Sequence, residues 1–279
     1  MDLHGKLAFI GGGRMAEALI RGVIEAELIK ADQVMVVEPV YERREFLKEN
    51  YHIQVFENSA AIRDCGVVIL AVKPQIVGKV LDECRRILDE NHLLISIAAG
   101  IPLVFLEEKL AGRGCRVIRV MPNTPALIME GASALSAGSL ASDEDLAVAE
   151  LIFNAVGKSV ILLESDLDAV TGLSGSGPAY VFSFIEALID SGVKVGLSRS
   201  VAEVLVLQTV LGSVKLAMET GEHPAQLRAM VTSPGGTTIA GLHAMEKQGF
   251  QGIIMDAVEA ATKRSVELGQ VVMSARKKE

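Results

Sequence analysis

A glycine-rich segment that follows a short apolar run constrains the fold of this chain more than any other feature. Residues 6–10 (KLAFI) have the pattern of a buried strand, and residues 11–16 (GGGRMA) lead from it into a helical pattern. This order and spacing are typical of a dinucleotide-binding turn. Gly11 makes the turn, Gly13 lets the main chain approach a pyrophosphate, and Ala16 allows the helix to pack closely. The N-terminus of that helix can then hold the diphosphate.

A second apolar run, residues 33–37, ends at an acidic residue. Glu38 lies 22 residues after Ala16, close to the spacing of the acid that binds the adenosine ribose in such folds. A carboxylate there accepts hydrogen bonds from a free 2′-hydroxyl and repels a 2′-phosphate. Arg43 and Arg44 could still accommodate NADPH, but we interpret them as part of a solvated helix whose own glutamates nearly balance their charge. The choice between NADPH and NADH stays open on these residues.

Further apolar runs alternate with helical patterns over the first part of the chain. They are residues 67–72, 93–99, 116–120 and 159–163. This rhythm predicts an α/β domain with a mainly parallel, Rossmann-type sheet over residues 1–164. Ligands of such sheets bind beyond the carboxyl ends of the strands, which here carry Lys73-Pro74, Gly100 and residues 121–125 (MPNTP). Asn58 either caps a helix or lies by the adenosine.

The strand pattern stops near Asp166, and long helical segments follow. They predict an all-helical domain over residues 165–279. One of its helices shows a capping box at Ser200 and Glu203, and residues 201–211 are apolar on nearly every side. Such a helix must be covered all round, which a single small helical domain cannot do. We therefore expect a homodimer built largely from this half.

Composition excludes several classes of partner. With 279 residues and 50% hydrophobic content, the chain can bury the cores of two domains. Its net charge of -8 argues against nucleic acid and anionic membranes as partners. No signal-like start is present and the longest apolar stretches are interrupted, so we expect no transmembrane segment. The cysteines and histidines show no metal-ligand spacing, which predicts no metal site and reduced thiols in a cytoplasmic protein.

Residues 233–238 (SPGGTT) form a small turn between two helical patterns. Glycines allow a ligand to approach the main chain, and the hydroxyl groups add donors to the free N–H groups of the following helix. A carboxylate would fit this turn. The alternative is a helix cap with a tight turn and no ligand.

Together these motifs resemble those of the pyrroline-5-carboxylate reductases, and the resemblance spans nearly the whole chain. The matching segments are residues 9–16, 71–74 (AVKP), 97–100 (IAAG), 121–125, 172–180 (GLSGSGPAY), 220–224 (TGEHP) and 233–238. The resemblance implies a Rossmann domain, a helical domain that interlocks with a second subunit, and reduction of 1-pyrroline-5-carboxylate to L-proline by NADPH or NADH. The reduction requires a hydride at the imine carbon and a proton on the nitrogen. Positioning the imine against the nicotinamide can therefore supply much of the rate.

The resemblance also implies roles for individual residues. The carboxylate would be held by Ser233, Gly235, Gly236, Thr237 and Thr238, and the Thr238 hydroxyl could also bond the ring nitrogen. Lys73 has three open roles: it contacts the coenzyme ribose, it assists the substrate, or it is a solvated lysine. Thr238 and Lys73 are thus the catalytic candidates. The predicted coenzyme-binding residues are Gly11, Gly13, Arg14, Met15, Ala16, Glu38, Asn58, Ala71, Val72, Lys73, Pro74, Ala98, Ala99, Gly100, Asn123 and Thr124.

Two other functions stay open on the sequence. The chain could reduce another small carboxylate or cyclic imine, which would usually bring a catalytic lysine in the helical half. Lys194 and Lys215 are candidates only by default, since neither lies in a recognisable motif. A non-catalytic dinucleotide-sensing module would keep the glycines but would not need the turn at residues 233–238.

Overall fold

The computed structural model describes residues 5–276. The chain forms two compact units, Met1–Ser176 with Ala260–Glu279, and Gly177–Glu259. We expected a boundary between residues 164 and 165, so the first unit takes in more of the chain than predicted. A reason is that Ser265 donates a hydrogen bond to Asp168 over 2.6 Å, which ties the end of the chain to residues just past that boundary.

A single eight-stranded sheet forms the centre of the first unit, in the order β3-β2-β1-β4-β5-β6-β7-β8. Every neighbouring pair is parallel except β6 and β7. The strands are β1 (Leu7–Ile10), β2 (Val34–Val37), β3 (Gln54–Phe56), β4 (Val67–Leu70), β5 (Leu93–Ser96), β6 (Arg116–Met121), β7 (Gly131–Ala137) and β8 (Gly157–Ile161). The prediction of a mainly parallel Rossmann-type sheet is confirmed, although β3 and β7 were not predicted.

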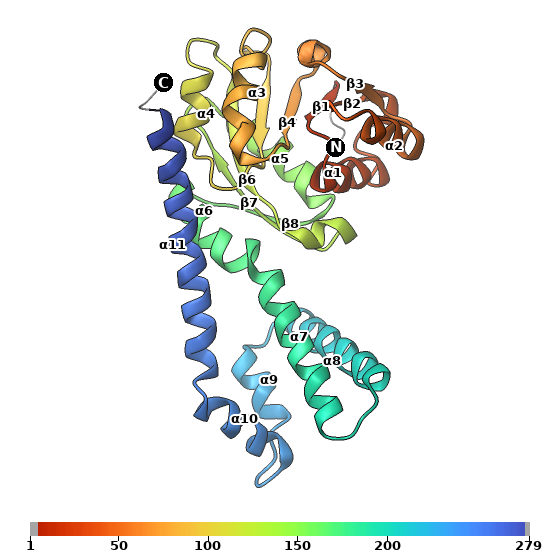
Figure 1. Ribbon diagram of the computed structural model, residues 1–279, viewed down its shortest axis with the longest axis vertical. Helices are drawn as coiled ribbons and strands as arrows, with labels where there is room; N and C mark the ends of the chain where they lie inside the picture. Colours follow the sequence, from red (N-terminus) through yellow and green to blue (C-terminus); the bar gives the residue numbers. More distant parts are fainter. Residues whose placement is uncertain (1–4, 277–279) are drawn as a thin grey trace. The chain divides into compact units, whose positions relative to one another are not determined.

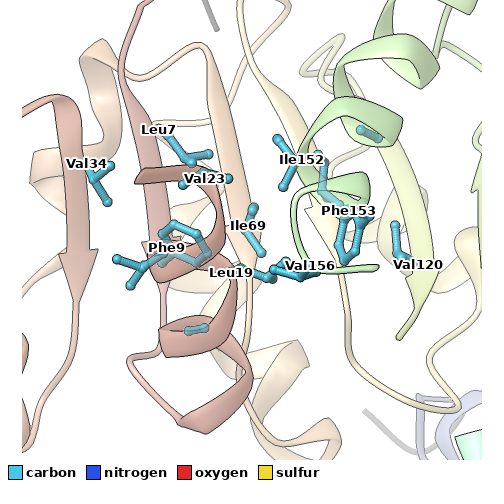
Figure 2. Close-up of a cluster of buried hydrophobic side chains, with 14 of the residues drawn as sticks. Leu7, Phe9, Leu19, Val23, Val34, Ile69, Val120, Ile152, Phe153 and Val156 are labelled. Atoms are coloured by element: carbon cyan, nitrogen blue, oxygen red, sulfur yellow. The ribbon is translucent and has the colours of Figure 1, made fainter. Parts of the chain in front are cut away.

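Helices cover both faces of this sheet (Figure 1). They are α1 (Arg14–Glu25), α2 (Tyr41–Tyr51), α3 (Val77–Cys84), α4 (Leu103–Lys109) and α5 (Asp143–Asn154), and a short helix, α6 (Leu167–Val170), follows β8. Side chains of one strand alternate between the faces, because successive residues of a strand point to opposite sides. Leu7 and Phe9 of β1 pack in the layer that contains α1 and α5, whereas Ala8 and Ile10 pack in the layer that contains α3 and α4. Figure 2 shows Phe9 and Phe153 in the first of these layers.

Two glycines set the register between β7 and β8. Gly131 lies opposite Gly157, and the N–H of Gly131 donates to the carbonyl of Val156 over 2.8 Å. Gly157 has a φ of +152°, and a Cβ there would overlap the main chain of Gly131. Only glycine fits this approach of two main chains.

The second unit is helical among its described residues. It contains α7 (Gly177–Lys194), α8 (Arg199–Thr220), α9 (Pro224–Met230), α10 (Thr237–Lys247) and the first part of α11 (Phe250–Arg276). The predicted capping box at Ser200 and Glu203 is wrong. Ser198 is the N-cap and accepts from the N–H of Val201 over 3.4 Å, so α8 begins before Ser200.

Helix α8 leaves most of its apolar side chains exposed in the single chain, and only Ala202 of this helix is buried. Val204 is 68% exposed and Leu205 is 54% exposed. By length and composition alone, α8 is also apolar enough to cross a membrane. A large uncovered apolar surface indicates an interaction site.

Candidate active site

The predicted coenzyme-binding residues follow the carboxyl ends of β1 to β6, which are parallel and therefore end at one edge of the sheet. β1 and β4 are neighbours although they are far apart in sequence, and the order reverses between them. This switch point is where doubly wound sheets bind their ligands. The structure thus brings these residues to one edge of the first unit.

The glycine-rich turn has the geometry that a pyrophosphate needs. Gly11 has a φ of +96°, and a Cβ there would lie 2.5 Å from the carbonyl oxygen of Ala71. Gly13, by contrast, has open space around the position of a Cβ. It is the N-cap of α1 and provides no side chain, so the first N–H groups of the helix, near Arg14 and Met15, remain available to an anion.

Ala16 contributes to the same site through packing. It is 1% exposed and lies in the core layer below the turn. This agrees with its predicted role in bringing the helix close to the strand. The residues present fit a dinucleotide.

Glu38 follows β2 directly and turns back toward the glycine-rich segment. One carboxylate oxygen accepts from the N–H of Gly12 over 2.8 Å, and the other accepts from the N–H of Val40 over 3.0 Å. Two main-chain donors therefore fix the carboxylate beside the turn, in the position expected for an acid that reads the ribose.

Arg43 and Arg44 are not solvated in the way we predicted. Nε of Arg43 donates to the carbonyl of Gly12 over 2.5 Å, and its Nη2 lies 2.5 Å from a carboxylate oxygen of Glu17. Nη1 of Arg44 donates to the carbonyl of Glu38 over 2.7 Å. The interpretation of a solvated, locally balanced helix was wrong, because both guanidinium groups reach past their own helix to main-chain carbonyls.

Glu17 and Tyr51 complete this cluster, and no pattern in the sequence singles them out. The hydroxyl of Tyr51 donates to Glu17 over 2.9 Å. Burial alone would raise the pKa of Glu17, but the hydrogen bonds from Arg43 and Tyr51 and the nearby positive charges hold it below its ordinary value. An acid in the first turn of a helix is common, so its spacing carried no signal.

The segments after β4 and β5 contribute small residues and one cation. The N–H of Ala71 donates to the carbonyl of Ile10 over 2.8 Å, which joins the ends of β4 and β1. Lys73 is exposed, directly ahead of Pro74. After β5, Ala98 is buried, Ala99 is exposed, and Gly100 has a φ of +72° that favours glycine.

Two predicted contact residues are engaged within the protein. Asn58 caps a short helix, since its side-chain oxygen accepts from the N–H of Ala60 over 3.2 Å. Asn123 is 9% exposed and bonds the main chain at two distant points. Thr124 beside it is exposed. Contacts of Asn58 and Asn123 with a coenzyme stay a prediction.

The predicted substrate loop lies in the second unit, between α9 and α10. Gly235 has a φ of +66°, and the N–H of Gly236 donates to the carbonyl of Ser233 over 3.1 Å. Gly236 is the N-cap of α10 and provides no capping side chain, so the first N–H groups of that helix are open to an anion. Thr237 is exposed and Thr238 is half-buried.

An open groove of about 880 Å³ lies next to this loop and is lined by residues of α9, α10 and the start of α11. Thr232 and Ile239, which flank the loop, line the groove, but the loop residues do not.

Lys194 and Lys215 are exposed on α7 and α8. Over residues 5–276 no three acidic, histidine or cysteine side chains gather as a metal site would require.

Comparison with known proteins agrees with this arrangement. Residues 164–268 match the family described as pyrroline-5-carboxylate reductase dimerisation, and residues 6–100 match that described as NADP oxidoreductase coenzyme F420-dependent. The dimerisation match includes all of α8, whose apolar side chains are mostly exposed in the single chain.

Named relatives cover almost the whole chain. Pyrroline-5-carboxylate reductase of Arabidopsis thaliana is 47% identical over 266 residues, which cover 95% of this chain and 96% of that protein. The reductase of Methanosarcina acetivorans is 46% identical over 95% of this chain and 98% of its own length.

Solved structures agree. A pyrroline-5-carboxylate reductase from Coxiella burnetii superposes with a TM-score of 0.90 at 34% identity, covering 95% of this chain and 99% of that one. Pyrroline carboxylate reductase from Plasmodium falciparum, solved with NADP bound, has a TM-score of 0.86 at 37% identity, covering 96% of this chain and 100% of that one. This chain belongs to the pyrroline-5-carboxylate reductase family.

Proposed function

We propose that the chain reduces 1-pyrroline-5-carboxylate to L-proline with a reduced nicotinamide dinucleotide, the last step of proline synthesis. The observation that carries this proposal is the presence of two uncapped helix N-termini that could each hold an anion, one in each unit. One is the uncapped start of α1 beside Gly13, and the other is the uncapped start of α10 beside Gly236. The first suits a diphosphate and the second a carboxylate.

The substrate loop then acts by binding and orientation. Ser233, Gly235, Gly236 and Thr237 hold the carboxylate, and the Thr238 hydroxyl reaches the ring nitrogen. When bound, the coenzyme supplies the hydride that the imine carbon accepts. A protonated imine is already electrophilic, so the protein has to orient it and exclude water.

The other predicted coenzyme contacts belong to the same proposal. Lys73 remains a catalytic candidate because it is an exposed cation at the edge of the sheet where the coenzyme is expected.

The chain works in the cytoplasm as a homo-oligomer. The three cysteines are free and buried, which suits a reducing compartment.

The test is an assay of the purified chain with the imine and each coenzyme, following coenzyme absorbance and proline formation by mass spectrometry. Thr238→Ala should fold, since a loop hydroxyl is worth at most about 2 kcal/mol, but should turn over more slowly. Thr232→Ala is the matched control, because its hydroxyl already bonds the carbonyl of Arg228 over 2.6 Å. No proline from the wild-type chain would refute the function. Unchanged kcat/KM in Thr238→Ala would remove that residue from the site.

A further inference from the structure

The coenzyme end of the site contains two acids that face the glycine-rich turn. The carboxylate of Glu38 is fixed by the N–H groups of Gly12 and Val40. Glu17 lies in the first turn of α1, where it pairs with Arg43. A ligand phosphate placed against this turn from the adenosine side therefore faces the carboxylate of Glu38.

Arg43 is the cation that a 2′-phosphate would need, and it is already occupied. Its Nε donates to the Gly12 carbonyl and its Nη2 to Glu17. Tyr51 donates to the other oxygen of Glu17, which fixes the acid in the position that holds the guanidinium. Only a quarter of the Arg43 side chain is exposed. To reach a phosphate, Arg43 would have to break a charge-assisted hydrogen bond of the stronger kind.

Arg44 does not replace Arg43 as a cation for the 2′-phosphate. Its Nη1 donates to the carbonyls of Glu38 and Pro39, over 2.7 and 2.9 Å, and its Nη2 lies 3.6 Å from Glu57. These contacts fix the backbone that follows β2, so this guanidinium positions Glu38.

We infer that the chain selects NADH over NADPH, and that Glu17 is a positioning residue for this choice because it withholds Arg43 from a 2′-phosphate. The inference rests on the proposed function only in that a nicotinamide dinucleotide binds at the glycine-rich turn. Glu38 accepts the 2′-hydroxyl of NADH and repels the 2′-phosphate of NADPH. Glu17 adds the second barrier by pairing with Arg43, whose Nε bonds the carbonyl of Gly12 in the turn.

This arrangement predicts coupling between the two acids. Removing Glu38 alone leaves Arg43 bonded to Glu17, and removing Glu17 alone leaves the repelling carboxylate in place. The double change removes the repulsion and frees the cation, so its effect should exceed the product of the single effects. Arg43→Met in the double variant should abolish the gain, and Arg43→Met alone should leave the weak binding of the phosphate unchanged.

The test measures binding of adenosine fragments by calorimetry, which needs neither the imine nor turnover. The probes are adenosine 5′-monophosphate and adenosine 2′,5′-bisphosphate. The variants are Glu17→Gln, Glu38→Ser, both together, both with Arg43→Met, and Arg43→Met alone. Glu49→Gln is the matched control, because Glu49 is an exposed acid at the far end of α2. Circular dichroism and thermal unfolding establish that each variant is folded.

The wild-type chain should bind the monophosphate at least about tenfold more tightly than the bisphosphate, as expected for charge repulsion at a partly exposed site. The double variant should bind the bisphosphate more tightly, and Glu49→Gln should behave as the wild type. A wild-type preference for the bisphosphate overturns the inference. If Glu17→Gln adds nothing to Glu38→Ser, the role of Glu17 is refuted. A clear fragment preference without imine reduction would refute the proposed function and leave this inference intact.

Discussion

The side-chain amide of Asn123 donates to the carbonyl of Ser174 over 3.1 Å, and its oxygen accepts from the N–H of Ala132 over 2.8 Å. One buried side chain thereby joins the end of β6, the start of β7 and the π-helical turn Thr171–Gly175. π-turns are rare and often mark functional sites. Asn123 thus contributes to the edge of the sheet through the loops that it holds.

We predict that Asn123→Ala lowers the free energy of unfolding by about 1–3 kcal/mol, because it leaves buried main-chain groups without partners. Urea unfolding measures this loss, and the slope of the free energy of unfolding against urea concentration should be unchanged. Asn50→Ala is the control: its amide bonds only the carbonyl of Phe46 one turn earlier on an exposed helix. It should change the free energy by less than about 0.5 kcal/mol. Equal losses in the two variants would contradict the structural role of Asn123.

Gly11 and Gly13 should respond differently to the same substitution. Gly13→Val should fold, since the glycine has a φ of -66° and open space at its Cβ, but the branched side chain would occupy the place of the pyrophosphate. Gly11→Val should destabilise the fold, because it requires a positive φ and meets the carbonyl of Ala71. Fluorescence titration with NADH and thermal unfolding separate the two effects. Wild-type coenzyme affinity in folded Gly13→Val would refute the phosphate site.

The cysteines should be unreactive until the protein unfolds. Burial raises the pKa of Cys65 to about 11 and that of Cys115 to about 12, and it also raises the pKa of Cys84. A thiol whose pKa is raised by folding stabilises the folded state fully below its unfolded pKa, here near 9.0, and this contribution is lost as the pH rises through the folded value. Iodoacetamide at pH 8 should label none of the three in the folded chain and all of them in urea. The free energy of unfolding should fall above about pH 9. Cys115→Ala should remove part of this fall, although the smaller side chain loses some packing in the core.

Charge on α8 should break self-association. The full chain should sediment as a dimer or a larger assembly, because Leu207 and Leu211 lie one turn apart and are exposed in the single chain. Leu207→Glu with Leu211→Glu should shift it toward the monomer. Leu140→Glu, at an exposed site between β7 and α5, should not. A wild-type chain that remains monomeric at micromolar concentration would contradict the use of this helix as an interface.

Much of the first unit could be predicted because β1, β2, β4, β5 and β6 are short, mostly buried apolar runs. The position of Glu38 also followed from spacing alone. β7 (GASALSA) was missed because small residues have little strand preference, and it is held by its neighbours β6 and β8 on either side. β3 was missed because it has three residues and only one neighbour, β2.

The pairing of side chains around the site could not be read from the sequence. Arg43 donates a hydrogen bond to Glu17, which lies 26 residues earlier in the chain. The local sequence around either residue does not indicate this partner. The same holds for Asn123, whose partners lie 9 and 51 residues away. Spacing predicts which residues reach the edge of the sheet, whereas their partners depend on how neighbouring loops pack there.

The glycine pair at the edge of the sheet has a consequence for how the chain avoids misfolding. β8 is an edge strand with a single neighbour, and such strands can slip by one residue. A slip would place Val156 or Lys158 opposite Gly131, where a side chain would collide with the backbone. Gly131 and Gly157 therefore permit only one register between β7 and β8. A newly synthesised chain that pairs the two strands in another register has to separate them before it can fold correctly.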